Sequence, residues 1–209
     1  RKFKLIIEYD GTRYHGWQVQ LNGITIQEVL QNCLKKITGE ERPVIGSGRT
    51  DAGVHAEAQA AHFETISKMT AQQFLMAFNS LLPHDIVIKQ VDEVPDTFHA
   101  QRSAKRKIYR YTILNRQYPS ALQHNRCLFI QYHLNIEAMR QAKTYLEGKH
   151  DFTAFRASNC EARNPVREIN SIDIEQDGDF IIIHCDGNGF LKYMVRNIVG
   201  TLVQVGRNK

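Results

Sequence analysis

The spacing of apolar residues over the first hundred positions predicts alternating strands and helices. Continuously or alternately apolar stretches, typical of strands, are separated by stretches in which apolar residues recur every three or four positions, typical of amphipathic helices. Thr25 and Glu28 have the spacing of a capping box at the first helix. Thr70 and Gln73 have it at the second, which Pro83 ends. The predicted elements are a strand at 3–9, a helix at 26–37, strands at 43–46 and 56–64, a helix between 70 and 83, and a strand at 85–91.

The order of elements begins again after a polar, irregular segment at 92–105, which we interpret as the join between two halves. Asn135 is placed to cap a helix that Gly148 stops, and Asp177-Gly178 is a typical hairpin turn. The predicted elements of the second half are strands at 107–114 and 127–132, a helix between 135 and 148, a hairpin of strands at 166–175 and 179–185, and a last helix with an apolar side at 194–203.

These elements together predict an α+β fold of two ferredoxin-like βαββαβ halves, at 1–100 and 101–209. We expect the halves to form a combined antiparallel sheet with the helices on one side and a central catalytic cleft. The second half stops one strand short of the pattern, which would leave an unpaired sheet edge. The expectation is therefore that the native chain continues beyond Lys209 with the missing C-terminal strand.

Composition changes this picture little. The 209 residues are 42% hydrophobic, which suffices for a sizeable core. No apolar run approaches the length of a bilayer span, and the first residues lack the pattern of a signal peptide, so we expect a soluble, cytoplasmic protein. The net charge of +5 is compatible with a polyanionic partner but does not establish one.

The sequence indicates neither a metal site nor a nucleotide cofactor. The four cysteines form no CxxC pair, and two of them, Cys33 and Cys185, fall in apolar patterns that place them in the core. His55-Ala56-Glu57 matches one half of a zinc deaminase signature, but the other half, P-C-x-x-C, does not occur. No P-loop or GxGxxG segment follows a strand.

The segment 46–56, GSGRTDAGVHA, is the strongest candidate for chemistry. Its three glycines free the backbone for unusual dihedral angles and for close approach to a ligand. Arg49 lies two residues before Asp51, an arrangement that suits an ionised carboxylate directed at a reacting group. The same residues also fit a tight connection between two strands with Asp51 as a turn residue, and composition alone does not choose between these interpretations.

A cluster of cations around one predicted strand is a candidate for binding an anion. Lys105, Arg106, Lys107 and Arg110 crowd a short stretch that also contains Tyr109. Interleaved cations and aromatic rings are typical of nucleic-acid-binding surfaces. The alternative is a solvated strand face.

A second charged group lies at the start of the last helix. Lys192 and Arg196 are one helical turn apart, and Arg196 lies beside an otherwise apolar stripe. If Arg196 is drawn inward it needs an anionic partner, for which Asp51 is the candidate. The alternative is an exposed arginine whose stem extends past the core.

Motifs at both ends of the chain and between them resemble those of TruA-type tRNA pseudouridine synthases, in the same order and at similar spacings. GRTDAGVHA is highly specific to that family. The residues that carry the resemblance are Glu8-Tyr9-Asp10-Gly11-Thr12, Tyr14, Gly16-Trp17-Gln18, Gln20, the segment 46–56, Phe98-His99-Ala100, Tyr109-Arg110-Tyr111, Asp151-Phe152, Phe155-Arg156 and Met194-Val195-Arg196-Asn197-Ile198-Val199-Gly200.

The resemblance implies isomerisation of uridine to pseudouridine in tRNA, without cofactor or metal. It implies that Asp51 is the catalytic nucleophile, attacking either C6 of the uracil or C1′ of the ribose, and that Arg196 is its basic partner. Arg49 would fill the space that the flipped-out base leaves, and Tyr109 would stack on the uracil. An aspartate is suited to this role because its carboxyl group, with an ordinary pKa of about 3.9, is ionised at neutral pH.

The resemblance also implies a substrate and an assembly. The substrate is the anticodon stem-loop of tRNA, at positions 38–40, and the enzyme is a homodimer whose two subunits both contact the RNA. Cations would position the RNA through its phosphates without reading sequence. The residues expected to bind substrate are Tyr109, Arg49, Lys105, Arg106, Lys107, Arg110, Arg156, Arg163, Arg167 and Lys192.

One position departs from the family pattern, and one alternative function remains. Where the family has Phe-His-Ala-Arg, this chain has Gln101 followed by Arg102, so the role of that arginine is open. The alternative is a non-catalytic RNA-binding module, because RRM domains share the βαββαβ plan. The chain lacks the RRM signature K/R-G-F/Y-G/A-F-V-x-F/Y, and a binding module has no need of an ionised aspartate in a glycine loop.

Overall fold

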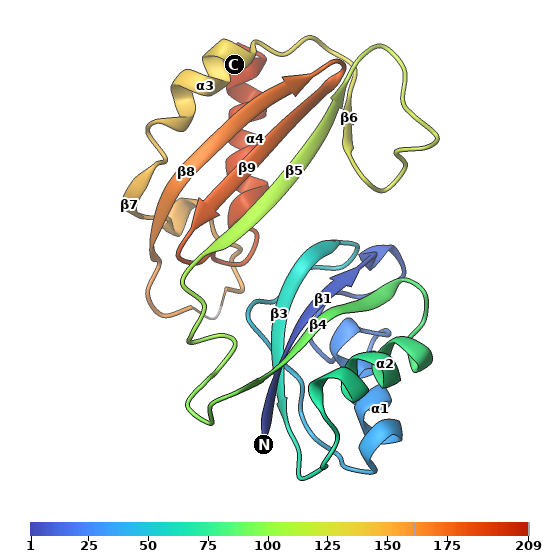
Figure 1. Ribbon diagram of the computed structural model, residues 1–209. Helices are drawn as coiled ribbons and strands as arrows, with labels where there is room; N and C mark the ends of the chain where they lie inside the picture. The colour runs from blue at the N-terminus through green and yellow to red at the C-terminus, as the bar shows by residue number, and fades with distance from the viewer. Residues whose placement is uncertain (161, 209) are drawn as a thin grey trace. The chain divides into compact units, whose positions relative to one another are not determined.

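Each half of the chain folds around its own hydrophobic core in the computed structural model, which describes residues 1–160 and 162–208 (Figure 1). The first unit comprises Arg1–Ala104 and the second begins at Lys105. The predicted α+β class with two halves is confirmed. The strands pair in two sheets, one in each unit.

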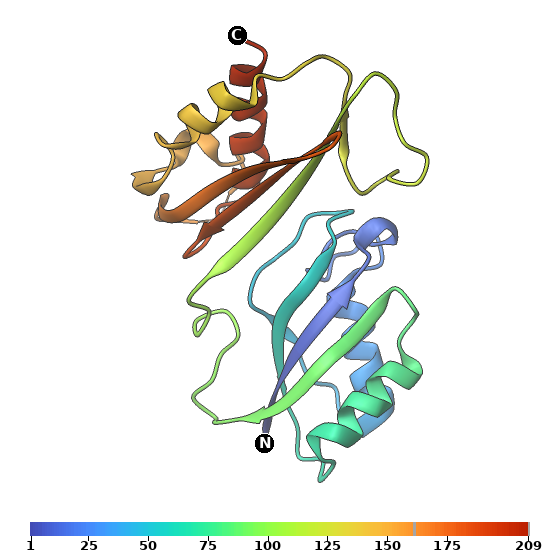
Figure 2. The ribbon, with the colours of Figure 1, turned by 45° about the horizontal axis from the view of Figure 1, so that its top comes forward.

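The first unit has the predicted βαββαβ order. Its antiparallel sheet has the strand order β2-β3-β1-β4, and α1 and α2 cover one face of it, as Figure 2 shows. On β1 the fully buried side chains of Phe3, Leu5 and Ile7 alternate with more exposed neighbours, which is the pattern of a strand with one face on the core. The elements are β1 (Lys2–Tyr9), a 3-10 turn η1 (Gly11–Arg13), α1 (Ile26–Thr38), β2 (Ile45–Gly46), β3 (Ala56–Glu64), α2 (Ala71–Leu81) and β4 (Ile86–Val94).

The caps of the two helices follow the sequence closely. The complete capping box forms at α2, where Thr70 Oγ1 accepts from Gln73 N and the Gln73 side chain accepts from Thr70 N. At α1, Thr25 accepts from Glu28 N, and the helix ends at Gly39 in the left-handed conformation.

β2 is shorter than predicted. The strand was expected at 43–46 but covers only Ile45–Gly46. Pro43 has no N–H to donate, and both backbone groups of Val44 are bound by side chains of α1: Gln31 accepts from its N–H and Gln27 donates to its carbonyl. Val44 therefore packs under the sheet as part of the core instead of pairing with β3.

The second unit has the strand order β6-β5-β9-β8-β7, with α3 and α4 on one face (Figure 2). The pairs are antiparallel except for β5 and β6, which run parallel. The elements are β5 (Lys107–Asn115), β6 (Leu128–Ile130), α3 (Ile136–Lys143), β7 (Gly148–Asp151), a 3-10 turn η2 (Thr153–Phe155), β8 (Val166–Asp177), β9 (Phe180–Gly187) and α4 (Met194–Gly206).

Three details of this unit differ from prediction. α3 ends at Lys143, before the expected stop at Gly148. β7 was not predicted, because its four residues are exposed and polar or glycine and it forms by backbone pairing with β8. In the β8–β9 hairpin Asp177 pairs with Phe180, so the two-residue loop is Gly178-Asp179, one residue later than predicted, with Gly178 at φ 56°.

The two cysteines predicted to lie in the core are buried. Burial raises the pKa of the Cys33 thiol to about 11 and that of Cys185 to about 12. Both thiols are therefore protonated at neutral pH and behave as small apolar side chains.

Candidate active site

The glycine-rich segment 46–56 forms the connection from β2 into β3. Ser47 N donates to Ala60 O at 2.7 Å, which closes the end of the sheet. Val54 N then donates to Asp51 O at 3.2 Å, so residues 51–54 make a tight turn that begins at Asp51. Gly53, the third residue of that turn, has φ 78°, a conformation that favours glycine. Asp51 is thus both a turn residue and a candidate for chemistry, and the two interpretations of the sequence are compatible.

This loop is packed against a second segment, residues 10–17, at glycine contacts too close for any side chain. A Cβ added to Gly11 would lie 2.0 Å from the carbonyl oxygen of Val54, and one added to Gly16 would lie 2.4 Å from that of Thr50. Trp17 N donates to Thr50 O at 3.0 Å. The segment around Gly11 and Gly16, which is distant from the loop in sequence, therefore packs directly against the loop backbone and restricts its conformation.

His55 joins the two segments at the other end of the loop. Gly11 N donates to His55 Nδ1 at 3.2 Å, so this ring nitrogen presents its lone pair. A carboxylate oxygen of Asp10 lies 3.1 Å from the same nitrogen and also accepts from the backbone and hydroxyl of Thr12. The backbone N–H of Gly11 and the carboxylate of Asp10 therefore both lie within hydrogen-bonding distance of His55, which ties segment 10–17 to the end of the loop.

The candidate residues Asp51 and Arg49 differ in exposure. Asp51 is partly buried, whereas Arg49 is exposed. A carboxylate that is only partly buried stays accessible to a substrate, and the turn fixes the backbone that carries it. The predicted partner Arg196 belongs to the second unit, so its pairing with Asp51 stays a prediction.

Asp85 anchors the segment 10–17, and sequence reasoning missed it. Arg13 donates to Asp85 Oδ2 from Nε at 2.9 Å, and Tyr14 donates its hydroxyl to Oδ1 at 2.7 Å. Burial alone would raise the pKa of Asp85, but the bonds from Tyr14 and Arg13 outweigh it and hold the pKa below its ordinary value. No motif marks Asp85, because it meets its two partners, Arg13 and Tyr14, only in the fold.

In the second unit, Tyr109 on β5 is partly buried and packs against the edge of the hydrophobic core. Its ring packs edge-on against Phe190, with ring centres 5.1 Å apart. Lys107, two residues earlier on β5, is partly buried, and burial together with the neighbouring charge of Arg167 lowers its pKa. The structure therefore brings together four residues on one face, namely Lys107, Tyr109, Arg167 and Phe190.

The other predicted phosphate-binding residues are more dispersed. Lys105, Arg110 and Arg163 are exposed, and Arg156 is partly buried and donates to the carbonyl of Ala162 at 3.3 Å. Arg102, at the position that departs from the family pattern, is exposed.

Arg106 has a structural partner. Its Nε donates to Asp186 Oδ2 at 2.6 Å, and the Asp186 side chain is only 8% exposed. The Arg106 bond, followed by a weaker one from Asn170, holds the pKa of Asp186 below its ordinary value in spite of burial. Arg106 therefore stabilises the end of β9 whether or not it also contacts a ligand.

We expect this pair to make stability depend on pH. A carboxyl group whose pKa is lowered in the folded state stabilises the fold above its unfolded pKa, about 3.9, and loses that contribution as the pH falls through the folded pKa. Arg106→Gln should therefore be less stable than the wild type at pH 7, and the difference should shrink below pH 4. Urea unfolding at several pH values measures it.

A control is Arg116→Gln, which breaks an exposed pair with Asp179 at 3.3 Å and the bonds from the same guanidinium to the carbonyls of Tyr118 and Pro119. Because the Asp179 pair is exposed, the pH-dependent deficit expected for Arg106→Gln should not appear in this variant. A deficit of Arg106→Gln that stayed constant down to pH 2 would contradict the assignment to Asp186.

At the start of α4, Lys192 and Arg196 share an aromatic ring. Lys192 Nζ lies 5.6 Å and Arg196 Cζ 4.9 Å from the ring centre of Tyr193, which has φ 64°. A tyrosine in this left-handed conformation is strained, which directs attention to its function. Sequence reasoning missed Tyr193, although an aromatic residue among cations was visible.

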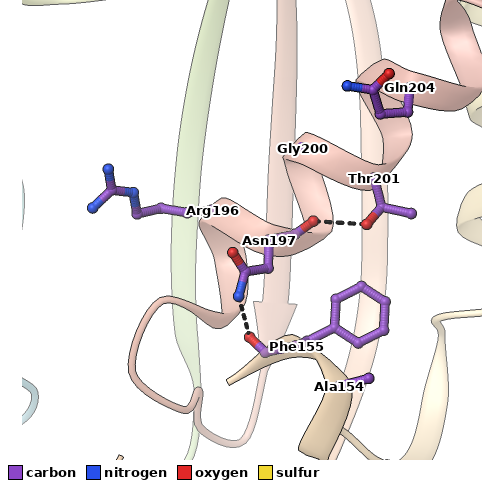
Figure 3. A pocket seen from close by; sticks show the side chains of 7 residues that line it. All are labelled: Ala154, Phe155, Arg196, Asn197, Gly200, Thr201 and Gln204. Carbon is purple, nitrogen blue, oxygen red and sulfur yellow. Dashed lines mark hydrogen bonds between the residues drawn. The ribbon is translucent and has the colours of Figure 1, made fainter. Parts of the chain in front are cut away.

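A shallow pocket lies next to this helix start, between α4 and η2. Its lining residues are Ala154, Phe155, Arg196, Asn197, Gly200, Thr201 and Gln204. Asn197 donates to the Phe155 carbonyl at 2.8 Å, and the Arg196 side chain extends away from Phe155 (Figure 3). Arg196 is exposed, as in the second interpretation of the sequence, and is not drawn into the core of its own unit.

Among residues 1–160 and 162–208, no cluster of three His, Cys, Asp or Glu side chains is arranged to hold a metal ion. Within the same described ranges, none of the helices is long and apolar enough to span a membrane.

Comparisons with known proteins agree with these motifs. The sequence pattern of a family described as tRNA pseudouridine synthase matches residues 5–101 and 142–209. Proteins named tRNA pseudouridine synthase A from Thermoanaerobacter sp. (strain X514) and Ruminiclostridium cellulolyticum are 51% and 50% identical to this chain, matching all of it and 86% of their own lengths. One from Citrifermentans bemidjiense is 50% identical, with 84% of its length matched. This chain therefore belongs to the tRNA pseudouridine synthase family.

Proposed function

We propose that this chain isomerises uridine to pseudouridine in tRNA, with Asp51 as the nucleophile. The observation that carries the proposal is identity of about half the residues over the whole chain to proteins named for this activity. The partly buried Asp51, held at the start of a glycine turn, gives that activity a reacting group. A non-catalytic RNA-binding module would not need this arrangement.

The proposed reaction breaks the bond between N1 of uracil and C1′ of ribose and forms a bond between C5 and C1′. An Asp51 oxygen attacks C6 or C1′, which produces a covalent intermediate, and is released when the new C–C bond is complete. The C5 proton leaves to solvent, the N1 position gains a proton, and no net oxidation occurs. The chemistry of the site therefore needs an ionised carboxylate and a base brought out of its stack.

The other candidate residues are assigned supporting roles. Arg49, exposed on the same loop, fills the space vacated by the flipped base, and Tyr109 stacks on the extruded uracil. Arg196 is the basic partner of the nucleophile. The cations near Tyr109, including Lys107 and Arg167, hold phosphates. The remaining proposed contacts are Lys105, Arg106, Arg110, Arg156, Arg163 and Lys192.

The activity is tested by release of tritium from tRNA labelled at C5 of uridine. We expect stoichiometric release that requires the protein, since the C5 hydrogen is lost in every turnover. Absence of release from tRNA that lacks pseudouridine would overturn the proposed function. Mapping of the product positions tests the narrower proposal that uridines of the anticodon stem-loop are the targets.

Tyr109→Ala should weaken productive binding by about 1–3 kcal/mol, the usual contribution of one stacked base. Tyr109→Phe keeps the ring and its contact with Phe190, so it should lose much less. Both effects are measured as kcat/KM on the same tRNA. If Tyr109→Phe were as inactive as Tyr109→Ala, the hydroxyl and not the ring would be the essential group.

Two further proposals concern the whole protein. We propose that it acts as a cytoplasmic homodimer, as the resemblance to the TruA type implies. Light scattering at micromolar concentration should give twice the mass of one chain, and a single-chain mass would contradict the dimer.

A further inference from the structure

We propose that Tyr9 and Thr50 form a positioning pair that sets the direction of the Asp51 carboxylate. The inference rests on the proposed function, because it assigns Asp51 the role of nucleophile. It concerns Thr50, which belongs to the catalytic loop, and Tyr9, which contacts it; the chemistry of the reaction does not itself specify a role for either residue.

The first residue of the pair, Tyr9, is held rigidly in the sheet. Tyr9 is the last residue of β1, is 3% exposed, and is held in the sheet between Ala56 on β3 and Ile86 on β4. Its ring packs beside Trp17, with ring centres 6.3 Å apart. A buried ring on the central strand of a sheet has little rotational freedom, so its hydroxyl is a fixed point.

The second residue of the pair, Thr50, directly precedes the proposed nucleophile Asp51. The hydroxyl groups of Tyr9 and Thr50 are hydrogen-bonded at 2.9 Å. The Thr50 carbonyl accepts from Trp17 N at 3.0 Å and lies so close to Gly16 that no side chain would fit there. Thr50 is therefore held by its side chain and by its backbone from two directions.

Holding Thr50 restricts the peptide that leads into Asp51. On the other side of Asp51, the 3.2 Å bond from Val54 N to its carbonyl fixes the turn. A nucleophile gains from such restraint because displacement by about 1 Å can lower a rate about 100-fold. Tyr9 and Thr50 act through Asp51 without themselves needing to touch the reacting atoms.

The test compares the steady-state kcat and KM of Tyr9→Phe and Thr50→Val, which each remove one hydroxyl or its partner at nearly constant shape, with those of the wild type. We expect kcat to fall about 10- to 100-fold, within the range that misplacement produces, while KM for tRNA changes less than about twofold. Thr50→Ser keeps the hydroxyl and should restore most of the rate. The double variant should be no slower than the slower single variant, because both substitutions remove the same bond.

Thr38→Val is the matched control for stability. It removes a hydroxyl that bonds Leu34 O and Glu40 N at the end of α1, away from the loop. It should lower the free energy of unfolding without changing kcat. Should Tyr9→Phe fail to fold, the comparison of Thr50→Val with Thr50→Ser decides the question.

The possible outcomes separate the two proposals. A wild-type protein without activity would overturn the proposed function. An active wild type with unchanged kcat in Thr50→Val would overturn the positioning pair alone. So would a loss confined to KM, or a Thr50→Ser variant as slow as Thr50→Val.

Discussion

Asp51→Asn should abolish pseudouridine formation, with a rate at least about 10³-fold below the wild type, while affinity for tRNA should stay within about tenfold. The amide has nearly the shape of the carboxyl group, so the turn closed by the bond from Val54 N to the residue 51 carbonyl is preserved. It carries no negative charge and would not form the ester-like intermediate of the proposed reaction. Tritium release measures the rate, and filter binding measures the affinity.

The control for this variant is Asp92→Asn, the same substitution on β4, where the carboxylate binds Lys4 at 2.8 Å. It should leave the rate unchanged. An Asp51→Asn protein that kept a tenth or more of the wild-type rate would remove Asp51 from the role of nucleophile. A protein that lost tRNA affinity as well would point to a binding role.

Gly11→Ala should both unfold the protein more easily and slow the reaction. The added methyl group would lie 2.0 Å from a backbone oxygen of Val54, a contact that a side-chain rotation cannot relieve. Overpacking of this kind typically lowers the free energy of unfolding by about 1–3 kcal/mol, and here the displaced backbone is the loop that carries Asp51. Urea unfolding and tritium release measure the two effects.

Gly200→Ala is the same substitution with the opposite expected result. Gly200 lies inside α4, and a Cβ added there has no heavy atom within 4 Å. Replacing a helical glycine with alanine should raise the free energy of unfolding by about 0.5–1 kcal/mol. If Gly11→Ala were as stable as the wild type, the packing of the loop on segment 10–17 would be looser than described.

Helices were the part of the fold that the sequence specified best. The capping box of Thr70 and Gln73, and the left-handed Gly39, are local signals because the residues that interact are close in the chain. β7 and the shortened β2 were not predictable in this way. β7 is set by pairing with β8, and β2 is cut short by side chains of α1 that bind Val44.

The candidate site likewise has some features that local sequence signals predict and others that depend on tertiary contacts. The glycines around Asp51 mark the loop in the sequence, and Gly53 is required locally because the turn places it at positive φ. The tertiary contacts of the loop were not predictable, since Gly11, Gly16 and Tyr9 come close to Val54 and Thr50 only after the sheet has formed. Asp85, which fixes Arg13 and Tyr14, carries no local signal.

The glycine contacts have a consequence for protein engineering. The conformation of residues 46–56 depends on close packing against residues 10–17. Transplanting the eleven-residue loop alone into the strand connection of another protein would therefore transfer the sequence without its conformation. A graft intended to carry the chemistry has to bring both segments, together with the strands that hold them in register.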